Sequence, residues 1–378
     1  MAIAEQTPLR SRLHLLYWLL GYKIAVLILL ACAIVLLPPL FSLENYYANL
    51  HGPSAPGPWS RYFSTWDTQG YLMISEYGYG VEQPLAAYFP LWPFCVRLFS
   101  YLTGGDHLLA GTILANLMSI FGLLALYELI LLNKDQGVAD RTLLLMLAFP
   151  GALFFLFPYT EALFLLVSVM LFYHMSKGNY WIAGIFGFFA ALARPVGILL
   201  AIPLALHILK KRKFPALVSI AFPMAGYLVY LLILKVSTGD AFSGFAAQKL
   251  FISQASVLRI FDIPGFLQAL ASPELLHGFS GSVIDRVWFV LLCISLPLIW
   301  KMNTDWFFYS LLVGFIPAMS NQFVSFTRYS LVIFPLFIAV AQVFSTERMT
   351  RWFNLLLFTL FGIQIIFLVL HINFYWAG

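Results

Sequence analysis

One carboxylate in this sequence has surroundings that suit acid–base chemistry. Asp67 lies in the stretch WDTQGYLMISEYGYG and is the only Asp or Glu between Glu44 and Glu76. The neighbouring aromatic residues could stack on a sugar ring, and the glycines allow a close approach of the chain. A carboxylate in an apolar, partly dry pocket gains proton affinity, as a general base requires. The alternative is a structural Asp that caps a helix over about 70–78.

Two further charged residues border apolar runs, where a charge is costly and is commonly paired or functional. Glu161 follows Thr160, and an acidic residue after a Thr N-cap satisfies the first turn of a helix. Glu161 could instead bind a substrate hydroxyl or pair with Arg194. Arg194 precedes Pro195 and would suit the C-terminus of a helix, but its guanidinium fork also matches a phosphate.

Arg328 is expected to begin a helix, where the partial positive charge of the N-terminus disfavours a cation unless an anion is nearby. No Asp or Glu lies within the twenty residues before it. A lipid phosphate would supply the anion, so the sequence predicts that Arg328 is a phosphate ligand. The alternative is an arginine that extends to the lipid headgroups.

Gln248 and Lys249 lie in an expected loop, where they could contact the same phosphate or an acceptor. The histidines at 51, 107 and 277 have no metal-ligand spacing, so we predict no tightly bound metal and no cofactor. No P-loop or Rossmann-type glycine pattern is visible. The predicted substrate pocket combines Glu161 and Gln248 with five aromatic residues: Trp66, Tyr71, Tyr88, Trp92 and Tyr329.

The elements that position these residues must be membrane helices. Of the 378 residues, 62% are hydrophobic and only 10% are charged, with a mean hydropathy of +0.89. Soluble domains carry about 25% charged residues. The basic residues form short clusters between apolar runs, which is typical of cytoplasmic loops and argues against a nucleic-acid partner. We therefore predict an all-α polytopic membrane protein.

Apolar runs near the length of a membrane span predict about eleven crossings, with a range of nine to twelve. The run 180–209 is divided at Arg194-Pro195, because proline disfavours helix at the preceding residue. This division keeps the basic cluster 210–213 in the cytoplasm, together with Lys23 and the N-terminus, and places the C-terminus outside. The segments are about 14–40, 108–132, 141–157, 161–176, 180–209 as a pair, 215–236, 286–300, 306–320, 328–344 and 352–372.

Two outside segments, 41–107 and 237–285, are longer than a connection requires and would roof a cavity open to lipid. The apolar stretch 84–102 contains three prolines, so short helices in the membrane interface are expected there. We interpret the chain as a single transmembrane domain over 1–378, with a module over about 14–236, the loop 237–285 and C-terminal helices over 286–372.

Five stretches carry a family resemblance: W-D with G-Y downstream at 66–79, AYFPLWP at 87–93, FPYTEALF at 157–164, ARPVG at 193–197 and FTRYSLVIFPLF at 326–337. In this order, over roughly 60–340, the chain resembles membrane glycosyltransferases of the GT-C superfamily, in particular the PIG-V type GPI mannosyltransferases and their bacterial relatives. Two features depart from the pattern. Many GT-C enzymes have paired acidic residues where this chain has one, and its acceptor-facing loop is short.

The resemblance implies an inverting transfer of a sugar, typically mannose, from a polyprenyl-phosphate donor to a glycolipid, glycan or protein acceptor outside the cytoplasm. In such enzymes an acidic residue of the first outside loop is the usual catalytic group, and the resemblance maps this residue onto Asp67. Arg328, Arg194 and Lys249 would hold the leaving phosphate. The compact loops favour a bacterial plasma membrane, with membrane lipids as further partners.

Two other functions remain open from the sequence. A lipid or glycolipid transporter would show paired repeats and ionisable residues near mid-membrane. No repeat is apparent, and the charged candidates fall at the outside ends of helices. A non-catalytic lipid-binding subunit would explain the lone Asp.

Overall fold

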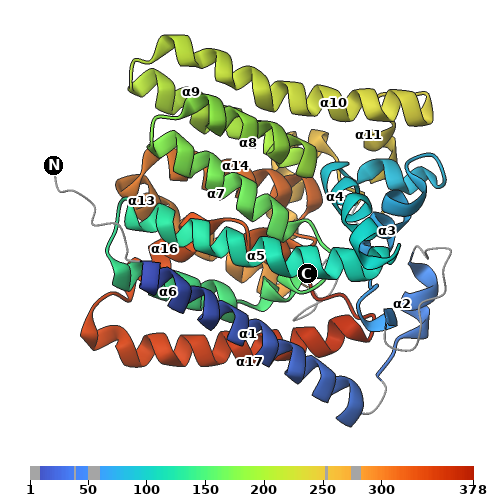
Figure 1. Ribbon diagram of the computed structural model, residues 1–378, viewed down its shortest axis with the longest axis horizontal. Coiled ribbons are helices and arrows are strands. Elements are labelled where there is room, and N and C mark those ends of the chain that lie inside the picture. Colours follow the sequence, from blue (N-terminus) through green and yellow to red (C-terminus); the bar gives the residue numbers. More distant parts are fainter. Residues whose placement is uncertain (1–8, 38–39, 50–59, 252–253, 274–281) are drawn as a thin grey trace.

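The computed structural model describes residues 9–37, 40–49, 60–251, 254–273 and 282–378, and the regular elements in these ranges are helices. The long ones lie side by side along the long axis of the molecule (Figure 1). They are α1 (Leu9–Leu36), α5 (His107–Leu131), α6 (Gln136–Ala148), α7 (Glu161–Ser176), α8 (Tyr180–Ala193), α9 (Ala201–Lys210), α10 (Ala221–Thr238), α13 (Val283–Met302), α14 (Thr304–Asn321), α16 (Phe334–Val343) and α17 (Thr350–Ile372).

Shorter helices fill the two long segments that were predicted outside. The first segment contains α2 (Leu43–Ala48), α3 (Asp67–Tyr77) and α4 (Leu91–Ser100), with the 3-10 turns η1 (Ser60–Tyr62), η2 (Gln83–Ala87) and η3 (Tyr101–Thr103). The second contains α11 (Ser243–Gln248), η7 (Val257–Phe261) and α12 (Ile263–Ala271). Helices α2, α3, α4 and α11 gather at one end of the bundle, at the right in Figure 1.

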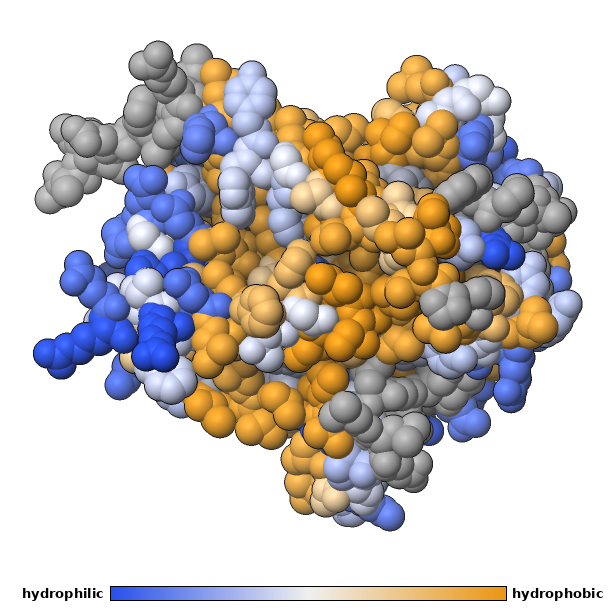
Figure 2. All heavy atoms as spheres, turned by 90° about the horizontal axis from the view of Figure 1, so that it is seen from below, coloured by the Kyte–Doolittle hydropathy of each residue, from blue (hydrophilic) through white to orange (hydrophobic). Residues whose placement is uncertain are grey.

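The surface of the bundle carries an apolar band. Hydrophilic residues collect toward the two ends of the face shown in Figure 2, with hydrophobic ones between them. Large apolar side chains such as Ile28 on α1 and Phe358 on α17 are exposed to the surroundings. Among the described residues, five helices are long and apolar enough to cross a membrane by themselves. The prediction of an all-α polytopic membrane protein is therefore confirmed.

Each predicted segment corresponds to helix, although several are interrupted. The segment 141–157 divides into α6 and the 3-10 helix η4 (Pro150–Phe155). Backbone carbonyls at this break accept hydrogen bonds from a side chain of α17 in place of helical N–H groups. Gln364 Nε2 lies 3.0 Å from both Leu147 O and Phe149 O. An irregular backbone inside a membrane protein requires such internal partners. The number of membrane crossings stays a prediction.

The sequence suggested that Lys23 belongs to a cytoplasmic segment, but the structure places it inside a long helix. It lies in the middle of α1 with 5% of its surface exposed, and its Nζ donates to Phe155 O at 2.9 Å. The carbonyl at the end of η4 thus provides a local partner for a charge at the centre of an apolar helix.

The predicted break at Arg194-Pro195 is present. Helix α8 ends at Ala193, Arg194 is extended, and η5 (Pro195–Leu200) leads into α9. The chain turns tightly here, since a Cβ on Gly197 would lie 1.9 Å from Ala190 O. Because α9 lies beside α8, Arg194 and the basic cluster 210–213 are at opposite ends of the bundle (Figure 1).

The last interruption lies between α14 and α16. The 328–344 segment begins as the five-residue helix α15 (Phe326–Ser330) and continues as α16 after a turn. A further turn, η6 (Phe214–Ile220), precedes α10, and η8 (Glu347–Met349) precedes α17. Three segments therefore lie near α3, at the end of the molecule where the short helices gather: the start of α7, the α8–η5 turn and α15.

Candidate active site

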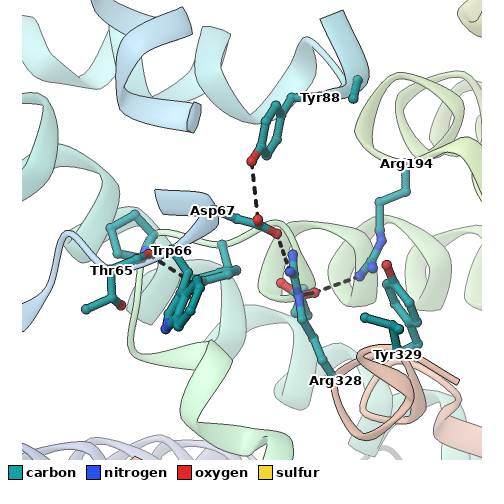
Figure 3. Close-up of polar contacts among 12 residues, drawn as sticks. Thr65, Trp66, Asp67, Tyr88, Arg194, Arg328 and Tyr329 are labelled. Carbon is teal, nitrogen blue, oxygen red and sulfur yellow. Dashed lines mark hydrogen bonds and ion pairs between the residues drawn. The ribbon is translucent and has the colours of Figure 1, made fainter. Parts of the chain in front are cut away.

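Four predicted charged residues form one continuous cluster, here named the charge network: Asp67, Arg328, Glu161 and Arg194. Arg328 donates from Nη1 to Asp67 Oδ2 and from Nε to Glu161 Oε1. Arg194 donates from Nη1 to the same Glu161 oxygen at 2.9 Å. The side chains approach from four separate elements (Figure 3). The pairing of Glu161 with Arg194, one of the two roles considered from the sequence, is present.

The charge network is buried at one end and more open at the other. Glu161 is completely buried, Arg328 is 4% exposed and Arg194 is 7% exposed, whereas the side chain of Asp67 is 28% exposed. Two carboxylates oppose two guanidinium groups, which offsets the large penalty for burying each charge alone. Asp67 is therefore the member of the network that a substrate can reach most readily.

Asp67 does not act as a helix cap. It is the first residue of α3, whose N-cap is Trp66, and no side chain caps this end. Trp66 adopts a left-handed φ of 51°, which is unfavourable for a large residue and requires support from its surroundings. Thr65 supplies part of it: its hydroxyl lies 2.7 Å from His371 Nε2, and its carbonyl accepts from Tyr159 at 3.2 Å. His371 was not among the residues predicted for the site, although a histidine in an apolar run was a signal.

Tyr88 completes the surroundings of the Asp67 carboxylate. Its hydroxyl donates to Asp67 Oδ1 at 3.2 Å. The ring packs directly on α3, where a Cβ on Gly70 would come within 2.7 Å of it. Burial, with the adjacent Asp67 carboxylate, raises the pKa of the Tyr88 phenol well above its usual value. The expectation of an apolar pocket around Asp67 is therefore wrong, because its immediate partners are a phenol and a guanidinium group.

The protein itself supplies anions for Arg328, which the sequence assigned to a lipid phosphate. Arg328 is the third residue of the five-residue helix α15, and its anions are the two carboxylates of the network, far away in sequence. The guanidinium group also covers the ring of Tyr159, with 4.5 Å between the group and the ring centroid. Within the described residues, Nη2 of Arg328 and Nη2 of Arg194 have no hydrogen-bond partner, which leaves donors for a further anion.

A second carboxylate holds α15 in place. Asp285 Oδ1 accepts hydrogen bonds from the Thr327 backbone N–H at 2.6 Å and from its hydroxyl at 2.5 Å. Asp285 is 1% exposed and begins α13, so it fixes the residue next to Arg328. The approach to α15 is strained, since Phe323 and Ser325 have φ values of 67° and 66°. Nothing near Asp285 in the sequence indicated that it supports this turn.

Several predicted pocket residues are packing residues instead. Trp92 is completely buried, and its indole N–H donates to Pro158 O at 3.1 Å. The ring of Trp66 lies away from the Asp67 carboxylate in Figure 3 and packs against Trp376 at 5.3 Å. Tyr71 is 6% exposed and packs edge-on against Tyr88. The sugar-stacking role predicted for Trp66 and Trp92 therefore does not fit this structure.

The remaining candidates lie around the network without joining it. Tyr329 is half-buried, and the guanidinium group of Arg194 covers its ring at 5.0 Å. Gln248 donates to Ala87 O at 3.4 Å, next to Tyr88 in the chain. Lys249 is exposed at the end of α11 and makes no ion pair with the described residues. A phosphate role for Lys249 has no support from this arrangement.

No three His, Cys, Asp or Glu side chains gather into a metal-binding group in the part of the chain that the structure describes. Two of the three histidines considered from the sequence, at 51 and 277, lie outside the described residues. His107 contacts Ser75 instead, with 2.9 Å between its Nδ1 and the hydroxyl. The absence of a bound metal stays a prediction.

Comparison with protein families gives one match. The sequence model of the Mannosyltransferase (PIG-V) family matches residues 53–252, which is more than half of the chain. The matched region contains Asp67, Glu161 and Arg194, whereas Arg328 follows it. No curated protein matches the chain. The extent of the family match, in a helical membrane protein with a buried charge network, shows that this chain belongs to the mannosyltransferase (PIG-V) family.

Proposed function

We propose that this membrane mannosyltransferase transfers mannose from a polyprenyl-phosphate donor to an acceptor hydroxyl with inversion, and that Asp67 is the general base. The observation that carries the proposal is the position of Asp67 at the accessible end of the charge network, beside the guanidinium group of Arg328. A base and a cation side by side suit a reaction that removes a proton and expels a phosphate.

In the proposed reaction Asp67 takes the proton from the acceptor hydroxyl, whose oxygen attacks the anomeric carbon. The bond between that carbon and the phosphate oxygen breaks, and polyprenyl phosphate leaves. Arg328 and Arg194 stabilise the charge that develops on the leaving group, using the donors that have no partner among the described residues. Stabilisation of developing charge is usually the largest catalytic contribution.

We also propose that the end carrying Asp67 faces the outside of a bacterial plasma membrane, with the N-terminus in the cytoplasm. The basic cluster 210–213 supports this orientation, because it lies at the end of the bundle opposite Arg194 (Figure 1). Cytoplasmic ends of membrane proteins are enriched in Lys and Arg. The donor then reaches the site from the surrounding lipid, and the acceptor is a glycolipid, glycan or protein on the outer face.

The test is sugar transfer by the purified protein in lipid nanodiscs, with radiolabelled polyprenyl-phosphate mannose and a panel of glycolipid acceptors. Replacement of Asp67 by Asn should lower the transfer rate by about two to four orders of magnitude. Glu76→Gln is the matched control, because it removes one negative charge from the same helix, where Glu76 bonds to the neighbouring Tyr77. Equal rates for wild type and Asp67→Asn would refute the assignment of the base.

A wild-type protein that transfers no sugar from any donor tested would instead favour a lipid transporter or a lipid-binding subunit. Movement of a fluorescent polyprenyl phosphate between the leaflets of proteoliposomes distinguishes these two. Glu161, Arg194 and Arg328 are buried and paired with one another, and this favours the enzyme.

A further inference from the structure

Arg328 occupies a position between two carboxylates that differ in accessibility. Its Nε faces Glu161, which is completely buried and which Arg194 also contacts. Its Nη1 faces Asp67, whose side chain is 28% exposed. In the ligand-free protein, the residue proposed to be the base is therefore engaged by the cation proposed to receive the phosphate.

We propose that the donor phosphate and Asp67 compete for Arg328, so that donor binding releases Asp67 from its ion pair and makes it available as the base. This inference rests on the proposed function. It adds an order of events, because the base becomes available only after the donor has bound.

The structure favours exchange at Asp67 over exchange at Glu161. Removing Arg328 from Glu161 would leave a completely buried carboxylate with Arg194 as its one ion-pair partner among the described residues, and its Oε2 already has no partner there. Asp67 can be rehydrated when it separates, because part of its side chain is accessible. Glu161 thus acts as the fixed anchor and Asp67 as the exchangeable partner.

Two aromatic rings restrict where the guanidinium group can move. Arg328 covers Tyr159 at 4.5 Å and Phe154 at 5.3 Å from their centroids. With its Nε held by Glu161 and its plane held by these rings, the group can exchange partners at its Nη atoms without leaving the site. A phosphate oxygen can therefore take the position of Asp67 Oδ2 with little rearrangement of the protein.

The charge balance of the reaction agrees with this exchange. A prenyl phosphosugar is a phosphodiester with one negative charge, and the departing prenyl phosphate is a monoester that gains a second. Asp67 loses its own negative charge when it accepts the proton of the acceptor hydroxyl, as the bond from that oxygen to the anomeric carbon forms and the bond to phosphate breaks. The negative charge next to Arg328 thus passes from Asp67 to the phosphate, while the total stays constant.

The test is equilibrium binding of farnesyl phosphate, a short prenyl phosphate monoester, to the full chain in nanodiscs of zwitterionic lipid. Asp67→Asn removes the competing carboxylate, so the Kd should fall by about three- to tenfold relative to wild type. Glu76→Gln, which makes the same change in net charge on the same helix, should leave the Kd within about twofold. The uncharged alcohol farnesol should bind the wild type and Asp67→Asn equally.

An unchanged or higher Kd for Asp67→Asn would overturn the proposal, since Asp67 would then not compete with the phosphate. Equal gains in Asp67→Asn and Glu76→Gln would also overturn it, because a general field effect would explain both. The double variant Asp67→Asn/Arg328→Gln should lose the gain, and tight binding in this variant would show that another cation receives the phosphate. These binding results are independent of whether wild type transfers mannose, which decides the proposed function.

Discussion

Arg328 donates from Nε to Glu161 Oε1 although the two residues are 167 positions apart in the sequence. The same oxygen accepts from Arg194, which lies 33 positions after Glu161. One carboxylate thus compensates two buried guanidinium groups and joins the first half of the chain to the C-terminal helices. Its loss should affect the stability of the protein more strongly than the loss of any exposed charge.

Glu161→Gln should lower the free energy of unfolding by about 3–5 kcal/mol, because Arg194 loses its carboxylate partner and Asp67 alone remains to balance two buried guanidinium groups. Unfolding of the purified protein in detergent by chemical denaturant measures the effect. Glu76→Gln, which replaces a partly exposed carboxylate, should change stability by less than about 0.5 kcal/mol. The double variant Glu161→Gln/Arg194→Gln restores a balanced network and should recover part of the loss. A double variant no more stable than Glu161→Gln would argue against charge compensation.

Tyr88→Phe should reduce the rate of transfer by about tenfold, since a hydrogen bond to a charged group contributes about 1.5 kcal/mol. Burial raises the pKa of the Tyr88 phenol well above its usual value, so the phenol stays a protonated donor throughout the working pH range. The rate ratio of wild type to variant should therefore be constant between about pH 6 and pH 9, well below the ordinary tyrosine pKa of about 10. A ratio that falls toward one as the pH rises would mean that the phenol ionises in this range.

Gly70→Ala should disturb the same contact from the opposite side. A methyl group at Gly70 would lie 2.7 Å from two ring carbons of Tyr88, so the ring must move away from Asp67. Overpacking of this kind lowers stability by about 1–3 kcal/mol, partly offset by about 1 kcal/mol from the higher helix propensity of alanine. Transfer should fall at least as far as in Tyr88→Phe. Full activity in Gly70→Ala would contradict the role assigned to this contact.

Gln364→Leu tests the support of the α6–η4 break. The carbonyl of Leu147 keeps its hydrogen bond from the Tyr22 hydroxyl, but that of Phe149 loses its side-chain donor, and an unsatisfied buried group lowers stability by about 1–3 kcal/mol. Thr359→Val is the control on the same helix, because Thr359 is exposed and bonds only to Leu355 O, one turn before it. Equal effects of both variants on chemical unfolding would indicate that Gln364 does not support the break.

The helices of this protein were largely predictable from the sequence. Apolar runs located the segments, and proline located the break at Arg194-Pro195, because its ring disfavours helix at the preceding residue. The turn at Arg194-Pro195 is an example: the proline alone predicts that the charged residue before it lies between two short helices. Asp67 was found in the same way, as the only carboxylate in a long segment. The breaks within 141–157 and 328–344 were not predicted.

The partners within the site were not predictable, because they join residues that are far apart in the sequence. Arg328 and Asp67 are 261 positions apart, and nothing near Arg328 indicates that its anions come from α3 and α7. The sequence could not distinguish the packed indoles of Trp66 and Trp92 from exposed ones, since both roles favour an aromatic residue. In the sequence Lys23 resembles a charge that flanks a membrane helix, whereas in the structure it donates a hydrogen bond to the carbonyl of Phe155.

The spacing of the charge network along the chain has a consequence for biosynthesis. Glu161 and Arg194 emerge from the ribosome only 33 residues apart, so they can be buried as a neutral pair before α15 has been made. Arg328 follows much later and finds Asp67 already present as its own counter-charge. The two charges made close together, Glu161 and Arg194, can thus enter the growing bundle as a matched pair, whereas the residue that waits for its partner, Asp67, is the most exposed member of the network.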